Sequence, residues 1–347
     1  MLQKDINIQK IAELAGVSKT TVSRVLNHRP DVNPETRKKV EEIIEDLGYY
    51  PNAIARAFSR QKSMSIGLVF PNDESRAFSN PYYAELMRGI LGEAREKHYR
   101  VILSYLQNGD CFLLARQKIV DGILVLTPGS DHKARLKELL ELGVPLVSTS
   151  RVPGMKALHY VAVDEFGASS EMIQYLISLG HRRIGFISGP KTLFSSGSRL
   201  RGYRAALKRN GIPCDPGLIA FGDTSMESGE RVMGQFLDGK KGMTAVFVGS
   251  DMMAIGAKHA IETRGMRVPE DISLVSSDAT DVADYLETPM TTLEQPTFQR
   301  GRQAARMLID MIEGRPVPDS VTLPMGIAVR KTTKAVSPAL RINSGKS

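Results

Sequence analysis

The sequence contains no tryptophan, and only two of its 347 residues are cysteines. Cys111 and Cys214 lie far apart, with neither a CxxC pair nor a histidine cluster beside them, so a disulfide framework or a zinc site is not expected. No apolar run approaches the ~18 residues of a membrane span, and the N-terminus lacks the apolar core of a signal peptide. These absences predict a protein of the reducing cytoplasm.

The sequence also lacks the residue patterns of the common enzyme classes. Its six histidines are scattered, and none lies beside a candidate nucleophile. The segment 189–198 is rich in glycine and serine but lacks the GxxxxGK(S/T) spacing of a phosphate-binding loop. We therefore expect no enzymatic activity, no cofactor and no bound metal ion.

What is present is the composition of a soluble globular protein, with 24% charged and 42% hydrophobic residues. The length exceeds what one hydrophobic core usually serves, so two or three folding units are expected. The formal net charge of +8 favours a polyanionic partner without identifying it.

The segment 6–27 predicts two short helices separated by a tight turn at Gly16. Asn7 is a candidate N-cap for the first helix and Ser18 for the second. The second helix has an apolar side and a front of short polar or basic groups without acids, which suits a groove lined by phosphates. This front consists of Lys19, Thr20, Thr21, Ser23, Arg24 and Asn27. The alternative is an ordinary helical hairpin inside a larger globule.

A third helix is predicted from Asn33-Pro34 to Gly48, with an N-cap residue followed by proline at the first helical position. Three helices with apolar faces are enough for a small core. From residue 65 the pattern changes to strands that alternate with helices, in two successive series. Such alternation predicts an α/β fold with two lobes, each built on a parallel sheet covered on both faces.

These segments closely resemble a known family. VSKTTVSRVLN (17–27), VNPETRKKVEEIIEDLGYYPN (32–52) and AIARAF (53–58) are similar to the DNA-binding head of the lactose-repressor/galactose-repressor (LacI/GalR) family of bacterial transcription regulators. The resemblance continues through NPYYAELMRGI (80–90), LGHRRIGFISGP (179–190), SDMMAIGA (250–257) and MTTLEQP (290–296). It therefore covers almost the whole chain.

The resemblance implies a helix-turn-helix domain over 1–50, a hinge helix and linker over 51–63, and a body over 64–335 shaped like periplasmic binding proteins. Lobe 1 would comprise 64–162 and 294–323, and lobe 2 would comprise 163–293 and 324–335. The polar tail 336–347 is expected to be disordered. One head per chain implies a homodimer on a near-palindromic operator in double-stranded DNA.

In the head, Lys19 and Thr20 match the family's specificity-setting pair, and Arg24 is the best candidate for a bidentate contact to guanine. Phe58 stands where the family has a leucine wedge in the minor groove, although it could instead pack under the body. The remaining residues are expected to hold phosphates or the hinge, each with a plain solvated position as the alternative. The complete expected set is Asn7, Ser18, Lys19, Thr20, Thr21, Ser23, Arg24, Asn27, Arg37, Tyr49, Ala55 and Phe58.

In the body, the resemblance places a small effector in the cleft between the lobes. Arg199 matches the family's ligand-gripping arginine and Asp278 its partner aspartate, a pair that suits a polyhydroxy compound. The expected set is Phe78, Asn80, Ser150, Arg199, Ser250 and Asp278. Ser150, Ser250 and Thr224 depart from the sugar-responsive pattern, so a sugar, a sugar acid or phosphate, and another metabolite all remain open.

We therefore expect a transcriptional repressor whose operator affinity is switched by a small metabolite. One alternative is a family regulator controlled by a protein partner, which a shrunken cleft and an exposed patch along Arg300, Arg302, Arg306 and Met307 would favour. Another is a body that no longer responds to ligand, for which the shortened segment 108–120 is weak support.

Overall fold

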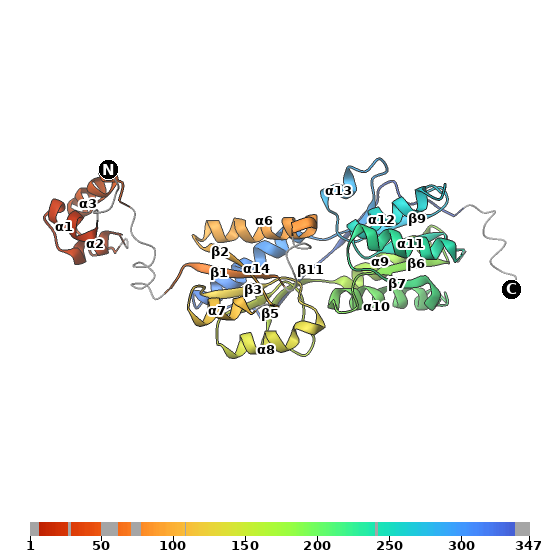
Figure 1. Cartoon of the computed structure of the whole chain (residues 1–347), viewed down its shortest axis with the longest axis horizontal. Helices are drawn as coiled ribbons and strands as arrows, with labels where there is room; N and C mark the ends of the chain where they lie inside the picture. The colour runs from red at the N-terminus through yellow and green to blue at the C-terminus, as the bar shows by residue number, and fades with distance from the viewer. Residues whose placement is uncertain are drawn as a thin grey trace. The chain divides into compact units, whose positions relative to one another are not determined.

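A computed structural model of the chain describes residues 7–26, 29–49, 62–70, 78–107, 109–239 and 242–336 (Figure 1). The chain divides into two compact units, residues 1–64 and 65–347, which are described separately below. Over the described ranges, no helix has the length and apolar character to cross a membrane. Residues 51–61 of the expected hinge, residues 337–347 of the expected tail, and Asn27 lie outside these ranges, and so therefore do Ala55 and Phe58.

Within its described residues, the first unit contains the helices α1 (Ile8–Ala15), α2 (Lys19–Leu26) and α3 (Pro34–Asp46). The predicted starts of α1 and α3 are confirmed, because the Asn7 side chain accepts a hydrogen bond from Lys10 N and the Asn33 side chain accepts one from Glu35 N. Gly16 ends α1 with a φ of 68°, a conformation that glycine adopts without a steric penalty. The apolar faces meet in one small core, formed by Ile11, Ala12, Ala15, Val22, Val25, Val32 and Val40.

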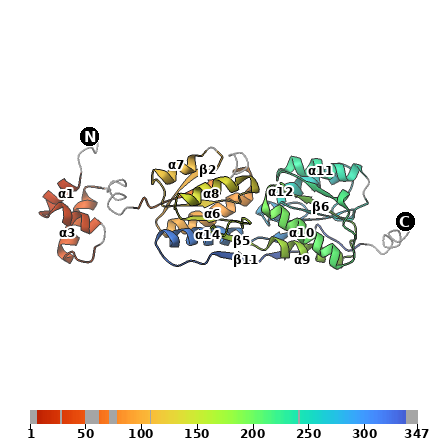
Figure 2. The same ribbon diagram turned by 90° about the horizontal axis from the view of Figure 1, so that it is seen from below.

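The second unit contains two six-stranded sheets, and the first of these is entirely parallel in the order β11-β5-β4-β3-β1-β2. Helices α7 and α8 pack on one face of this sheet, and α6 and α14 cover the other (Figures 1 and 2). The strands are β1 (Ser65–Phe70), β2 (Arg100–Tyr105), β3 (Gly122–Val125), β4 (Leu146–Ser148), β5 (His159–Val163) and β11 (Ser320–Leu323). The helices are α6 (Pro81–Glu96), α7 (Asp110–Arg116), α8 (Lys133–Glu141) and α14 (Thr297–Ile312).

The second sheet has the order β12-β10-β9-β8-β6-β7, and only its edge pair β10–β12 is antiparallel. One core lies under α11 and α12, and another lies under α9 and α10. The strands are β6 (Ile184–Ser188), β7 (Ile219–Phe221), β8 (Ala245–Val248), β9 (Ser273–Ser276), β10 (Thr291–Glu294) and β12 (Gly326–Ala328). The helices are α9 (Glu165–Ser178), α10 (Phe194–Arg209), α11 (Met226–Asp238), α12 (Asp251–Glu262) and the short α13 (Asp281–Asp284).

The chain passes between the two sheets three times. It leaves the first sheet after β5, returns after β10 through α14, and leaves again between β11 and β12. The predicted α/β fold with two parallel-dominated sheets is thereby confirmed. Helix α10 begins at Phe194, five residues before Arg199, and the short segment 108–120 contains the helix α7.

Helices on the outer layers approach each other closely through glycines. A Cβ atom on Gly89 of α6 would lie 2.1 Å from the Phe298 carbonyl oxygen of α14, and one on Gly301 would lie 2.2 Å from the Leu86 carbonyl oxygen. The pair α11 and α12 repeats this arrangement at Gly229 and Gly256. No side chain fits at these positions unless the helices separate.

We predict that Gly89→Ala destabilises the body by about 1–3 kcal/mol, because the added methyl group would overlap backbone atoms of α14. Gly92→Ala on the same helix is the matched control, since nothing lies within 4 Å of its Cβ position. That substitution should stabilise the protein by roughly 0.5–1 kcal/mol through helix propensity. Denaturant unfolding measures both, and equal effects of the two substitutions would contradict the close packing.

Candidate functional site

The front of α2 presents the side chains predicted to meet DNA. Lys19, Thr20 and Arg24 are exposed, while the apolar side of the helix is buried in the head core. Ser18 Oγ accepts from Thr21 N at 3.0 Å and lies 2.9 Å from Thr21 Oγ1, so Ser18 caps the helix that carries them. Within this arrangement Arg24 Nη1 lies 3.6 Å from Asp31 Oδ2 in an exposed pair, which DNA would have to replace.

The other predicted contacts in the head have structural roles in the free protein. Asn7 caps α1, the Arg37 guanidinium donates to the Arg29 carbonyl, and the half-buried Tyr49 packs against the head core. Ser23 is half-buried on α2. Such residues can still donate to phosphates, because phosphate contacts come from side chains and backbone groups that also fix orientation.

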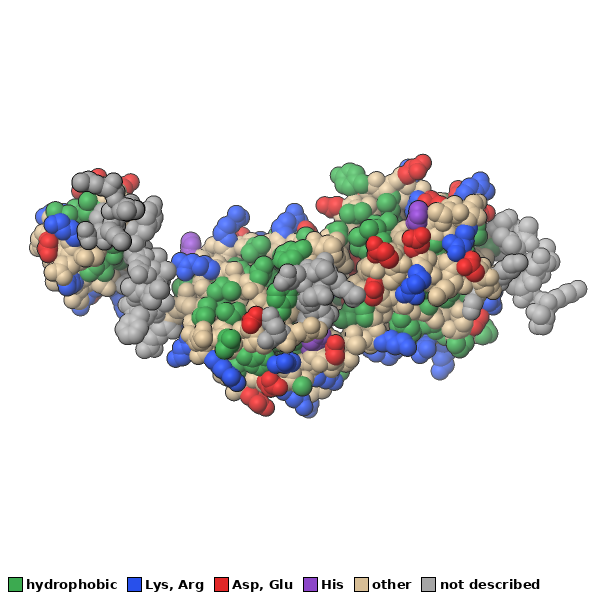
Figure 3. All heavy atoms as spheres, in the orientation of Figure 1, with side chains coloured by type: hydrophobic (Ala, Val, Ile, Leu, Met, Phe, Trp, Pro, Cys, Tyr) green, Lys and Arg blue, Asp and Glu red, His purple; other side chains and the backbone are tan. Residues whose placement is uncertain are grey.

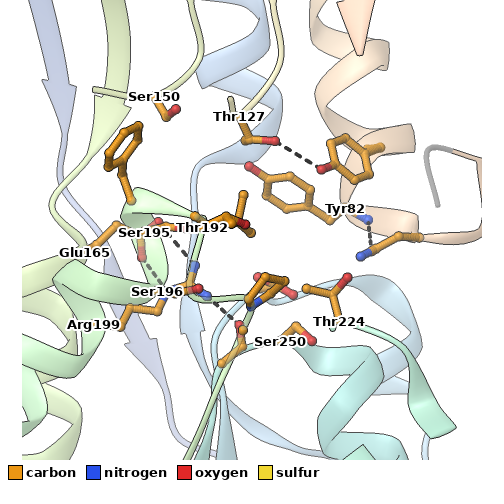
Figure 4. A pocket seen from close by; sticks show the side chains of 18 of the residues that line it. Tyr82, Thr127, Ser150, Glu165, Thr192, Ser195, Ser196, Arg199, Thr224 and Ser250 are labelled. Carbon is orange, nitrogen blue, oxygen red and sulfur yellow. Dashed lines mark hydrogen bonds and ion pairs between the residues drawn. The ribbon is translucent and has the colours of Figure 1, made fainter. Parts of the chain in front are cut away.

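In the body, a cavity of about 170 Å³ lies between the two sheets, well above the ~10–15 Å³ that one water needs (Figure 4). Its walls come from residues that follow the carboxyl ends of the parallel strands, where α/β sheets usually bind ligands. Thr127 and Ser150 follow β3 and β4 of the first lobe, and Gly249 and Asp278 follow β8 and β9 of the second. The cavity therefore has two walls, one from each lobe.

Arg199 lines the second-lobe wall and is held by a carboxylate that the sequence did not indicate. Its Nε lies 2.5 Å from Glu165 Oε2 and its Nη2 lies 3.2 Å from Glu165 Oε1, while Nη1 donates to the Gly249 carbonyl (Figure 4). This two-donor pairing fixes the guanidinium firmly. The adjacent carboxylates Glu165 and Asp278 raise the pKa of Arg199 despite its burial, so the group stays charged.

Asp278 belongs to a buried network and does not bond Arg199 directly. Its Oδ2 accepts from Asp251 N at 3.0 Å, and its Oδ1 accepts from Gln295 Nε2 at 2.9 Å. Burial raises the pKa of Asp278 to about 7, and the Asp251 charge adds to the effect against the opposing effect of Arg199. Near neutral pH this carboxyl group can therefore either accept or donate a hydrogen bond.

Three other expected residues also line the cavity, and one does not. Asn80 caps α6 by accepting from Tyr82 N, Ser250 caps α12 by accepting from Met253 N, and Ser150 Oγ has no hydrogen-bond partner among the described residues. Phe78 is not among the lining residues. It is 59% exposed, and its ring lies 6.0 Å from that of Phe70. The lining position of Phe78 is thus corrected, because Phe70 occupies that wall.

Three first-lobe side chains that the sequence did not single out as effector contacts line the opposite wall. Tyr83 Oη lies 3.1 Å from Thr127 Oγ1, and the Tyr82 ring projects into the cavity (Figure 4). The Arg300 guanidinium lies 5.2 Å from the centre of the Tyr82 ring. Arg300 and Met307 are buried, so the exposed patch that would favour control by a protein partner does not include these two residues. Arg302 and Arg306 pair with the buried Glu93.

The cavity has the chemistry of a binding site for a small polar molecule. Aromatic rings offer stacking surfaces, while paired charges and hydroxyl groups from both lobes fix orientation. No group of His, Cys, Asp or Glu within the described ranges is arranged to hold a metal ion.

Comparisons with known proteins agree with this architecture. Residues 7–52 match the model of "Bacterial regulatory proteins, lacI family", and residues 173–333 match that of "Periplasmic binding protein-like domain". The HTH-type transcriptional regulator CelR of Thermobifida fusca is 37% identical over 315 residues, covering 88% of this chain and 92% of CelR.

Two solved structures are also similar over most of the chain. The transcriptional regulator CelR-cellobiose complex has a TM-score of 0.74 at 34% identity, covering 94% of this chain and 100% of that one. The Lac repressor dimer bound to operator and the anti-inducer ONPF has a TM-score of 0.84 at 30% identity, covering 96% and 100%. The head with its exposed recognition helix and the two-lobed body with its cleft therefore belong to one known design, and this chain is a DNA-binding transcriptional regulator of the LacI family.

Proposed function

We propose that the protein is a homodimeric repressor of the cytoplasm whose operator affinity is switched by a polyhydroxy metabolite in the interlobe cleft. The observation that carries this proposal is the Arg199–Glu165 pair, a buried and oriented charge pair that lines an open cavity in a chain with a DNA-binding head. Similar proteins have been solved with cellobiose and with ONPF, which supports a sugar or sugar derivative as ligand. The cavity is open and Arg300 is buried, so neither observation supports control by a protein partner that binds along Arg300, Arg302, Arg306 and Met307.

The ligand would contact both lobes. Arg199 and Asp278 can bond hydroxyl groups from the second lobe, while Asn80, Ser150 and the tyrosine rings act from the first. A ligand that bridges both walls binds one arrangement of the lobes better than another, which is the requirement for a switch. Phe58 and Ala55 remain proposed hinge contacts, through which the head would be ordered on the operator.

A dimer would use the β2 edge of the first sheet. Leu103 on β2, Leu91 on α6 and Leu113 on α7 are each exposed by about half, and Ile119 lies beside them in the chain after α7. Figure 3 shows hydrophobic side chains gathered on this face of the first lobe. A contiguous apolar patch at a sheet edge favours association with a second copy.

The proposal is tested by selecting bound sequences from a randomised DNA pool and titrating the selected operator in the presence of sugars, sugar acids and sugar phosphates. A near-palindrome whose affinity is moved by one compound class supports the switch and gives its sign. Selection of a palindrome that no compound affects would reject the effector role, and failure to select any sequence would reject the operator role.

We predict that Arg199→Ala abolishes the response of operator binding to the effector while the operator is still bound. The substitution leaves Glu165 buried without its partner, which costs about 3–5 kcal/mol of stability. The double variant Arg199→Met/Glu165→Gln removes both charges and should also lose the response. Arg204→Ala, at an exposed position on the same helix, is the control. A normal effector response in the double variant would exclude Arg199 from the site.

A second prediction concerns Arg24. Arg24→Ala should lower the preference for one base of each half-site by about 1–3 kcal/mol, as expected for loss of a bidentate contact. Lys39→Ala removes the same charge from an exposed position on α3 and should leave base preference unchanged. The affinities of both variants are measured on operators with single-base changes. If Arg24→Ala lowers the affinity equally for all these operators, Arg24 contacts a phosphate and not a base.

A third prediction concerns the dimer. Leu103→Glu should shift the protein toward monomer in sedimentation experiments, because it places a charge in the apolar face that would be buried. Val282→Glu on α13 is the control, as Val282 has comparable exposure in the second lobe. An unchanged dimer in the Leu103 variant would locate the interface elsewhere.

A further inference from the structure

Arg300 is a charged side chain in the cleft, and no acidic residue within the described ranges forms an ion pair with it. It lies in the first turn of α14 and lines the cavity with only 2% of its surface exposed. Its Nε and Nη2 have no hydrogen-bond partner among the described residues. The guanidinium lies over the Tyr82 ring, and this cation–π contact compensates for only part of the lost hydration.

Arg199 on the opposite wall has the hydrogen-bond partners that a buried arginine normally has. Both arginines are buried and line the same cavity, but Arg199 directs Nε and Nη2 at the two oxygens of Glu165. In Arg300 the same two nitrogens, which form one edge of the guanidinium, are unpartnered. That edge matches the spacing of two oxygens in a carboxylate or phosphate.

The acidic residues of the cavity do not supply the missing partner. Glu165, Asp223 and Asp278 all belong to the second lobe, and Glu165 and Asp278 already accept the hydrogen bonds described above. The described lining residues of the first lobe include no acid; they are Phe70, Asn80, Tyr82, Tyr83, Thr127, Pro128, Ser150 and Arg300. The wall around Arg300 therefore has one positive charge, hydroxyl groups, an amide and aromatic rings.

Burial without a counter-ion lowers the pKa of Arg300 to about 10, which still leaves the group protonated at neutral pH. A buried unpaired cation is destabilising, and an apolar side chain at this place in a helix would fold more easily. Residues that reduce stability in a binding cleft are commonly retained for function. The cost would be offset when a ligand supplies the negative charge.

We propose that the effector is an anionic polyhydroxy compound whose carboxylate or phosphate group pairs with Arg300, while its hydroxyl groups contact the Arg199 and Asp278 wall. This inference rests on the proposed effector role of the cleft and adds the charge class of the ligand. The unpartnered nitrogens are themselves enclosed, so the anion reaches them as the Tyr82 side chain, which also lines the cavity, moves aside. The neutral hydroxyl groups of Tyr83 and Ser150 lie on the same wall and add donors to an oxyanion.

The test compares the full-length protein with Arg300→Met, which keeps the length and apolar volume of the side chain but removes its charge. Arg204→Met removes one positive charge from an exposed position and serves as the control. Thermal unfolding is recorded with inorganic phosphate, D-glucose 6-phosphate, D-gluconate and neutral D-glucose, each over a concentration series at fixed ionic strength. The phosphate and carboxylate compounds distinguish the two anion types.

The expected result has two parts. Without ligand, Arg300→Met melts at the same temperature as the wild type or higher, because an unpaired buried charge has been removed. At least one anionic probe raises the melting temperature of wild type and Arg204→Met, with an affinity that falls about tenfold or more in Arg300→Met. Neutral glucose gives a smaller effect that Arg300→Met does not change.

Two results would overturn the inference. A lower melting temperature for ligand-free Arg300→Met than for Arg204→Met would make Arg300 a structural residue, and anionic probes that fail to stabilise the wild type or act equally on both variants would exclude the anion contact. Failure of the proposed effector role would give a different result in operator-binding measurements. In that case no compound, charged or neutral, changes operator binding, whereas a neutral sugar that switches the wild type and Arg300→Met alike would reject only the anion contact.

Discussion

The second-lobe wall of the cleft depends on the carboxylate of Asp251. It is fully buried and accepts hydrogen bonds from Asp278 N, Thr280 N, Thr280 Oγ1 and Thr292 Oγ1. These four bonds join the start of α12 to the loop after β9 and to β10, so the carboxyl edge of the sheet is held at one point. A buried carboxylate is tolerated only with such compensation, and its loss would release several cleft residues together.

The two walls of the cleft differ in how their charges are satisfied. On the second lobe, Arg199 is held by hydrogen bonds to Glu165 and Gly249, and Asp278 accepts hydrogen bonds from Asp251 and Gln295, so both side chains are oriented before any ligand binds. On the first lobe, the Arg300 guanidinium lies over the ring of Tyr82, and its Nε and Nη2 have no hydrogen-bond partner among the described residues. Oriented side chains lower the entropic cost of ligand binding. An unpaired charge gains the most free energy when the ligand supplies its partner. Ligand binding should therefore act chiefly by drawing the first lobe onto a preformed second lobe.

Local sequence signals predicted the elements well, because caps, glycine stops and apolar periodicity depend on nearby residues. Asn7, Asn33 and Gly16 have the predicted roles, and strands alternate with helices in two series from residue 65, as predicted. The site was predicted less completely, since the chain crosses between lobes three times and brings distant segments together. Glu165 escaped notice because nothing local links it to Arg199, 34 positions later. Arg300 was considered only together with Arg302 and Arg306, as part of the surface patch that a protein partner would need, although successive residues of a helix are turned by about 100° about its axis.

The same geometry explains why α14 can couple the cleft to the outside of the first lobe. Arg300 at its start faces the cavity, Gly301 contacts the α6 backbone, and Arg302 and Arg306 hold the buried Glu93 of α6. Helices packed through glycine with a buried ion pair cannot slide independently, because separation would leave Glu93 buried and unpaired. A displacement of Arg300 would therefore move α14 and α6 together. Helix α6 carries Leu91 on the apolar face proposed for the dimer. In the proposed dimer, these two helices would link the charge of the ligand to the arrangement of the subunits without a longer pathway through the sheet.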